Sequence, residues 1–216
     1  MTALKLVDRA TAGQMLTPLI HGLGLDQPVL VGVGAGGLAV ATEIAKGVRA
    51  EIDQLAVREV YLDDPTHPPM YVGAVSGSGR VVIHPDAAAR LDSQPGRLEA
   101  AVAQAWQDIE DSPAQADGLE SVPGREVVVV DDGTSELTLL KAAIEVVRAA
   151  GPAHLTMAVP MAPQEVLDEL ATLADSVVCA EAVSWFPWFR LHGHLYDSNE
   201  TIGEIPPESG PTGRPA

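Results

Sequence analysis

Residues 127 to 138 read Val-Val-Val-Val-Asp-Asp-Gly-Thr-Ser-Glu-Leu-Thr, and the class of this chain follows mainly from them. Four consecutive β-branched residues predict a strand that is buried on both faces, as in a mainly parallel sheet. Asp131 and Asp132 follow at its carboxyl end, the edge where open α/β sheets bind their ligands. The run therefore predicts a central strand, 127 to 130, that delivers two carboxylates to a ligand crevice.

The same residues also allow a purely structural interpretation. Asp132, Thr134 and Ser135 are good helix-capping residues. Apolar residues then recur at helical spacing and would bury the next helix against the sheet: Leu139, Leu140, Ala143, Ile144 and Val147. Taken alone, the run does not separate a ligand site from a capped core helix.

Strands and helices alternate along the chain, which predicts an α/β fold with a mainly parallel central sheet and helices on both faces. A glycine-rich turn, Gly34-Ala35-Gly36-Gly37, is expected close to Asp131 and Asp132. The expected helices are 8–21, 38–48, 97–110, 136–149 and 164–173. The expected strands are 28–33, 52–57, 71–75, 80–83, 127–130, 154–159 and 176–179, with a proline-rich loop at 63–69.

Length and charge restrict the kind of protein this is. The 216 residues fit one domain over residues 1–202, followed by a proline- and glycine-rich tail, 203–216, that we expect to be disordered. A formal charge of −17 argues against nucleic acid or an anionic membrane as a partner. The sequence shows neither a transmembrane-length apolar run nor a signal-peptide pattern, so we expect a cytoplasmic protein.

Several collinear segments, over about residues 7 to 202, resemble the type I phosphoribosyltransferases, specifically bacterial members related to the purine-salvage type. The acidic strand and the loop after it are the main match. The others are Asp8 to Leu16, Pro28 to Ala41, Val57-Arg58, Val72 to Val75, Gly151 to His154, Val159 to Pro163 and Asp175 to Cys179.

The resemblance implies a type I fold with a small hood, and a site for phosphoribosyl pyrophosphate (PRPP), ribose 5-phosphate or a nucleotide. Asp131 and Asp132 would hold the ribose hydroxyls and Mg²⁺, and Arg58 would begin a mobile loop. Backbone amides would bind the phosphates. The 5′-phosphate would lie on Gly133, Thr134, Ser135, Glu136, Leu137 and Thr138, and the pyrophosphate on Gly34, Ala35, Gly36 and Gly37.

Three departures from the family pattern lie where the chemistry would be. The family has Pro-Arg-Gly-Gly where this chain has Gly34 to Gly37, Val-Arg-Lys where it has Val57-Arg58-Glu59, and Thr-Gly where it has Glu136-Leu137. Acids in place of cations repel a polyanion. We therefore expect lost or altered transferase activity with retained ligand binding. Two alternatives stay open: an active transferase that obtains its cations elsewhere, and a non-enzymatic interaction protein.

The aromatic residues are concentrated near the end of the chain: Trp185, Phe186, Trp188, Phe189 and Tyr196. The resemblance places them by the hood, where Trp188 would stack on a base. The same cluster is equally typical of a homodimer contact or of a hydrophobic plug for the sheet edge.

A dinucleotide-binding oxidoreductase is a further alternative. Gly32, Gly34 and Gly37 match the G-x-G-x-x-G fingerprint between a strand and a helix, and Glu59 could accept from a ribose 2′-hydroxyl. This interpretation leaves Asp131 and Asp132 without a role.

Overall fold

The main layer of the protein is a five-stranded parallel sheet. The computed structural model describes residues 8–64, 67–77, 79–83, 96–111, 119–133 and 137–183. The sheet consists of β1 (Val29–Val33), β2 (Glu51–Leu55), β6 (Glu126–Val130), β7 (His154–Pro163) and β8 (Ser176–Val183), in the order β2-β1-β6-β7-β8. All four pairings are parallel.

The central strand is the one that the sequence predicts. β6 pairs with β1 on one side and β7 on the other, and Val127, Val128, Val129 and Val130 are fully buried. Helices cover both faces of the sheet, which is what an all-apolar strand requires. The predicted α/β fold and the buried central position of this strand are both confirmed.

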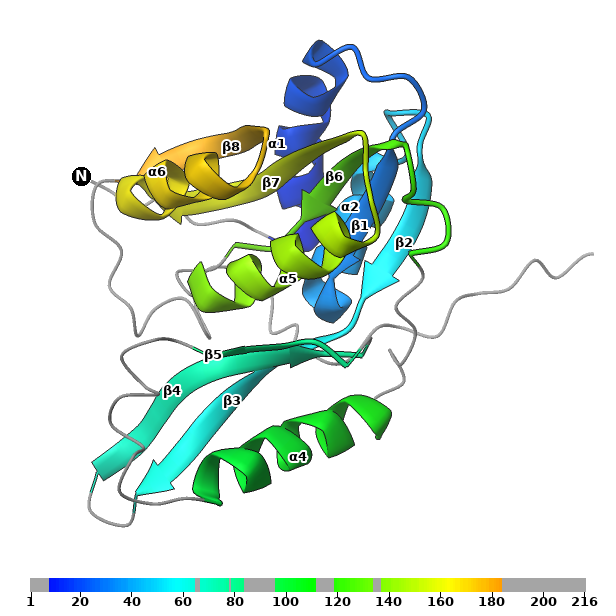
Figure 1. Cartoon of the computed structure of the whole chain (residues 1–216). Helices are drawn as coiled ribbons and strands as arrows, with labels where there is room; N and C mark the ends of the chain where they lie inside the picture. Colours follow the sequence, from blue (N-terminus) through cyan, green and yellow to red (C-terminus); the bar gives the residue numbers. More distant parts are fainter. Residues whose placement is uncertain are drawn as a thin grey trace, which may run out of the picture.

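Two pairs of helices form the outer layers (Figure 1). α1 (Arg9–Gly22) and α2 (Gly34–Ile44) share a core with Leu30, Val128 and Val130. α5 (Leu137–Ala149) and α6 (Gln164–Leu173) share the opposite core with Val29, Val127 and Val129. Across the described ranges, no helix combines the length and the apolar character that crossing a bilayer demands.

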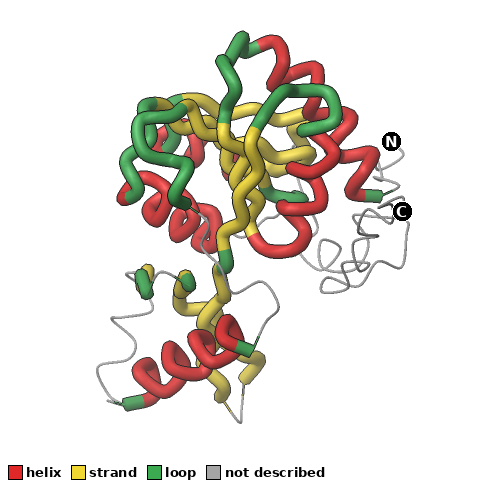
Figure 2. Tube along the Cα trace, turned by 90° about the vertical axis from the view of Figure 1, so that its right-hand side faces the viewer, coloured by secondary structure: helices red, strands yellow, loops and turns green. Residues whose placement is uncertain are grey.

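A small lobe follows β2 in the chain. It contains an antiparallel sheet of β3 (Val57–Asp64), β4 (His67–Ser76) and β5 (Val81–Ile83), together with α4 (Arg97–Glu110). Figure 2 shows this sheet and its helix below the main sheet. One face packs Val60, Val72 and Val75 against Ala105 and Ile109 of α4. The other face contributes Val57 and Ala74 to the core around α5.

Three expectations about local structure are wrong in detail. The stretch 52–57 is not one strand, because Ala56 separates β2 from β3 in the other sheet. The proline-rich stretch 63–69 is not only a loop, since β3 runs to Asp64 and β4 begins at His67. Prolines are tolerated here because β5 pairs with β4 only at Gly73, Ala74 and Val75, which leaves the start of β4 as an edge segment.

The third correction concerns Gly34 to Gly37, which form the first turn of α2 rather than a loop before a helix at Leu38. Glycine is a poor helix former, so local propensity favours a loop. These residues are helical nevertheless, because Gly36 and Gly37 pack closely against the end of β6. The aromatic segment 185–196, which the resemblance places by the hood, and the tail 203–216 lie outside the described residues.

Candidate functional site

β6 carries Asp131 and Asp132 to the carboxyl edge of the sheet, between the ends of β1 and β7. The backbone N–H of Asp131 donates to Ala158 O of β7 at 3.1 Å, so the ladder continues one residue beyond the strand. The arrowheads of β2 and β6 in Figure 1 mark this edge. The two acids therefore occupy the position at which open α/β sheets bind ligands.

Asp131 is buried and shapes the turn that follows the strand. Its side chain is almost inaccessible, with 3% exposure of the residue. Its Oδ2 accepts from the N–H of Gly133 at 2.9 Å, and Gly133 has a φ of 106°, which glycine adopts without strain. Burial raises the pKa of Asp131, and the negative charges of Asp132 and Glu59 raise it further.

Asp132 is held by an arginine from the first helix. Arg9 Nε donates to Asp132 Oδ2 at 2.9 Å, and the two side chains are 9% and 19% exposed. Burial raises the pKa of Asp132, while the Arg9 guanidinium opposes that effect. The Arg9 guanidinium therefore favours a negative charge on Asp132 over one on Asp131.

The first turn of α2 packs directly against Asp132 and the end of β6. A Cβ placed on Gly36 would lie 2.2 Å from Asp132 Oδ2, and one on Gly37 would lie 2.3 Å from Val130 O. A side chain at either position would therefore collide with the end of β6. The structure thus brings the glycine-rich turn and the two acids together, as the sequence predicts.

Glu59 lies in β3, near the start of the small lobe. Its negative charge is one of the causes that raise the pKa of Asp131, after burial and the charge of Asp132. Tyr61 Oη donates to Glu59 Oε2 at 2.8 Å. Arg58, which the resemblance singles out, is half-buried and donates from Nη1 to Val57 O at 3.2 Å.

The remaining predicted site residues divide into two groups. Leu137 and Thr138 begin α5, and Thr138 is buried at 9% exposure. Thr134, Ser135, Glu136 and Trp188 lie outside the described residues, so their expected contacts with phosphate and base stay predictions.

The acid pair does not make a Mg²⁺ site by itself. Asp132 Oδ2 is paired with Arg9, and Asp131 Oδ2 accepts from a backbone N–H. Within the ranges the structure describes, no group of three or more His, Cys, Asp or Glu side chains could hold a metal ion. Mg²⁺ is usually bound by one or two carboxylates together with substrate phosphates. The expected metal role of these acids therefore depends on a phosphorylated ligand and stays a proposal.

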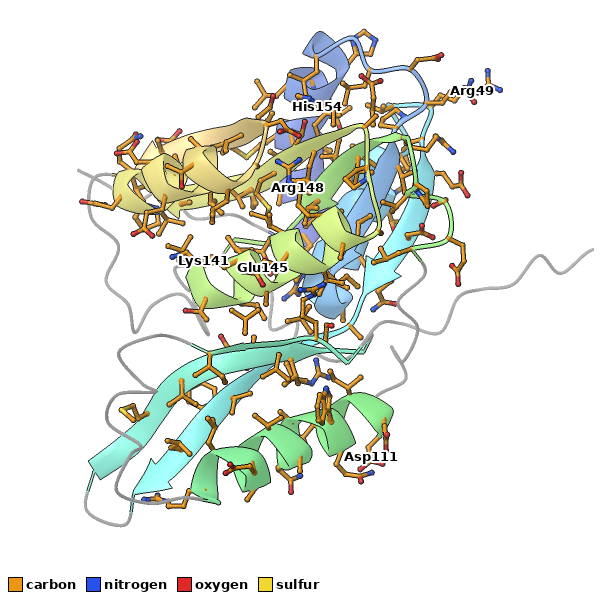
Figure 3. The ribbon with its side chains drawn as sticks, in the orientation of Figure 1. Arg49, Asp111, Lys141, Glu145, Arg148 and His154 are labelled. Atoms are coloured by element: carbon orange, nitrogen blue, oxygen red, sulfur yellow. The ribbon has the colours of Figure 1, made fainter. Side chains whose placement is uncertain are left out.

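The opposite edge of the sheet contains a cavity and an ion pair. The cavity, of about 390 Å³, lies between the ends of α1 and α2, and its rim includes Arg49, which points outward in Figure 3. Arg148 Nη2 donates to Asp175 Oδ1 at 2.8 Å, and the pKa of Asp175 is lowered to about 2 by this hydrogen bond and that from Leu155 N–H. Figure 3 shows Arg148 on α5 and His154 at the start of β7. These contacts connect helix and sheet and lie far from the carboxyl edge.

Sequence reasoning missed Arg9 as a site residue. The Asp8-Arg9 pair resembles the start of the family's first helix, but no local rule connects Arg9 with an acid 123 positions later. For Glu59 the sequence suggests only an acid for a dinucleotide ribose or a charge reversal after Arg58. One signal available in the sequence is the scarcity of cations, since only 13 lysines and arginines face 30 acids.

Fold and site together define an open α/β protein with paired acids and a glycine-rich helix start at its ligand edge. The model of the phosphoribosyl transferase domain matches residues 5–196. The chain therefore belongs to the phosphoribosyl transferase domain family. This membership lends no support to the dinucleotide-binding alternative.

Known relatives agree with this assignment. Two proteins of Mycobacterium tuberculosis, from strains CDC 1551 and H37Rv, are named as candidate phosphoribosyl transferases and are each 31% identical over 182 residues. The match covers 83% of this chain but 41% of each relative, so the chain spans less than half of their length. The crystal structure of the protein TT1426 from Thermus thermophilus is 31% identical, with a TM-score of 0.63 over 85% of this chain and 87% of that one.

Proposed function

We propose that the carboxyl edge of the main sheet binds the ribose 5-phosphate part of PRPP or of a nucleotide, and that transferase activity is lost or altered. The observation that supports the proposal most directly is the position of Asp131 and Asp132. They follow the central strand of a family member, and Asp132 touches the first turn of a helix. Carboxylates accept hydrogen bonds from sugar hydroxyls, and helix N-termini favour phosphate.

The two acids have different parts in this proposal. Asp132, ionised beside Arg9, accepts from a ribose hydroxyl. Asp131 accepts from the N–H of Gly133, which begins the segment that we assign to the 5′-phosphate. The first turn of α2 faces the position of the pyrophosphate.

The charges at this edge support weak pyrophosphate binding. The negative charge of Glu59 acts on Asp131, and Arg9 is already paired with Asp132. At ~5 Å and an effective dielectric constant of ~20, two unit charges interact by about 3 kcal/mol. An additional acid at this distance from a pyrophosphate would lower its affinity by about two orders of magnitude. Binding of a ribose phosphate with fewer charges is affected less.

Calorimetric titration with PRPP and with ribose 5-phosphate, with and without Mg²⁺, tests the proposal. We expect ribose 5-phosphate to bind in the submillimolar range, and no pyrophosphate release with a panel of purine and pyrimidine bases. Asp132→Asn should abolish binding, whereas Asp111→Asn, directly after the end of α4 (Figure 3), should not change it. Turnover with any base would favour the active transferase instead. Absence of binding to both compounds would favour the interaction protein.

A further inference from the structure

Arg9 occupies a position that helix stability alone does not favour. It is the first residue of α1, and a cation at a helix N-terminus opposes the helix dipole. The helix is capped independently by Asp8, whose Oδ1 accepts from Thr11 N–H at 2.7 Å. Arg9 is nevertheless 8% exposed and reaches Asp132 in a loop 123 positions away. Removing such a cation from water requires compensation, and Asp132 provides it.

The contact with Arg9 restricts Asp132 in a specific way. One side of the carboxylate meets Arg9 Nε at 2.9 Å, and the backbone of Gly36 leaves no space for even a methyl group beside it. The adjacent carboxyl group of Asp131 interacts unfavourably with an ionised Asp132. The guanidinium and the glycine backbone together therefore hold one orientation of Asp132.

We propose that Arg9 is a positioning residue. It holds Asp132 in the orientation in which the carboxylate accepts a hydrogen bond from a hydroxyl group of the ribose ring. This inference rests on the proposed function. A residue with this role contributes to affinity only when the ligand carries the hydroxyl group that donates a hydrogen bond to Asp132. A residue that only stabilises the fold would affect all ribose phosphates alike. Hydroxyl selectivity therefore separates the two roles.

The experiment is calorimetric titration of the full chain with ribose 5-phosphate and with its 2-deoxy and 3-deoxy analogues. Wild type should bind ribose 5-phosphate more tightly than at least one deoxy analogue. Arg9→Met should weaken ribose 5-phosphate binding by about tenfold or more and leave binding of that deoxy analogue nearly unchanged. Arg9→Lys should retain part of the selectivity, because it keeps the charge but not the planar geometry.

Arg125→Met is the matched control, since Arg125 forms an exposed ion pair with Glu51 at the other end of the sheet and should behave as wild type. Should Arg9→Met fail to fold, Arg9→Gln replaces it in the same comparison. Equal loss of all three ligands, or no loss, overturns the positioning role while the proposed function stands. Absence of ribose 5-phosphate binding to wild type overturns the proposed function, and the role of Arg9 with it.

Discussion

Replacing Gly36 by alanine should damage the site more than the fold. The new Cβ would lie 2.2 Å from Asp132 Oδ2 and 2.5 Å from its Cγ, so the carboxylate must turn away and the 2.9 Å contact with Arg9 must lengthen. Because a side-chain end can move, we expect the low end of overpacking costs, about 1–2 kcal/mol of unfolding free energy. Affinity for ribose 5-phosphate should fall about tenfold or more as the ion pair loosens.

The neighbouring glycine provides the comparison. A Cβ on Gly37 would lie 2.3 Å from the carbonyl oxygen of Val130, which is part of the central strand and cannot turn away. Gly37→Ala should therefore cost about 3 kcal/mol or more. Gly22→Ala is the control, because a Cβ there meets no atom within 4 Å. It should be neutral or stabilise by up to about 1 kcal/mol.

Denaturant unfolding measures the three stabilities, and calorimetry measures ribose 5-phosphate binding. Gly37→Ala should lose the most stability, Gly36→Ala less and Gly22→Ala the least. Gly36→Ala should lose much of its affinity for ribose 5-phosphate although its loss of stability is modest. Wild-type affinity in Gly36→Ala would refute the reasoning that contact with α2 orients Asp132. A Gly37→Ala protein that is more stable than Gly36→Ala would refute the packing argument.

Three further perturbations follow from the sequence and the structure. The double change Glu136→Thr, Leu137→Gly removes an acid and gives the backbone more conformational freedom, so the affinity for ribose 5-phosphate measured by calorimetry should rise. No gain in a folded variant would mean that these two residues are not what weakens phosphate binding. Asp175 has its pKa lowered to about 2 by Arg148, so its contribution to stability is complete above ~pH 4 and is lost as pH falls toward 2. When the free energy of unfolding is measured against pH, Asp175→Asn should reduce its fall in acid by less than about 1 kcal/mol, because the side chains of Arg148 and Asp175 are both over a third exposed. A steeper fall in the variant than in wild type would contradict the stabilising role of this ion pair. Trp188→Ala should dissociate an oligomer in size-exclusion chromatography if the aromatic segment is an interface, or weaken nucleotide binding at unchanged size if it is a pocket wall; a variant identical in size, stability and binding would exclude both.

Much of the main sheet could be predicted because its signals are local. Four valines before two acids require a strand covered on both faces, and helical spacing over 97–110 and 164–173 gives α4 and α6 their observed bounds. The boundary at Ala56 could not be predicted in this way. Continuous strand propensity runs through it, and only the pairing of Leu55 with Val33 and of Val57 with Ser76 shows that the chain changes sheets.

The candidate site was predictable only in part, because some of its contacts join residues that are far apart in the sequence. Asp131 and Asp132 are adjacent in sequence, and glycines beside a strand end indicate close approach of backbone. The ion pair from Arg9 depends on how α1 lies against the sheet, which no residue spacing encodes. The conversion of Gly34 to Gly37 into a helical turn likewise depends on β6 lying beside them, since propensity alone opposes it.

The insertion of the small lobe between β2 and β6 has a consequence for how the protein folds. Arg125, just before β6, donates to the carbonyl of Gln27, just before β1, at 2.7 Å across 98 positions. Closing a chain segment of that length costs about 4 kcal/mol of chain entropy, so β1 and β6 should pair late unless the small lobe forms first and shortens the span. A chain whose synthesis stops before β6 already contains Arg9 of α1 and the residues of the small lobe, Glu59 of β3 among them, yet it lacks both Asp131 and Asp132. The ligand edge should therefore be among the last parts of the molecule to be completed.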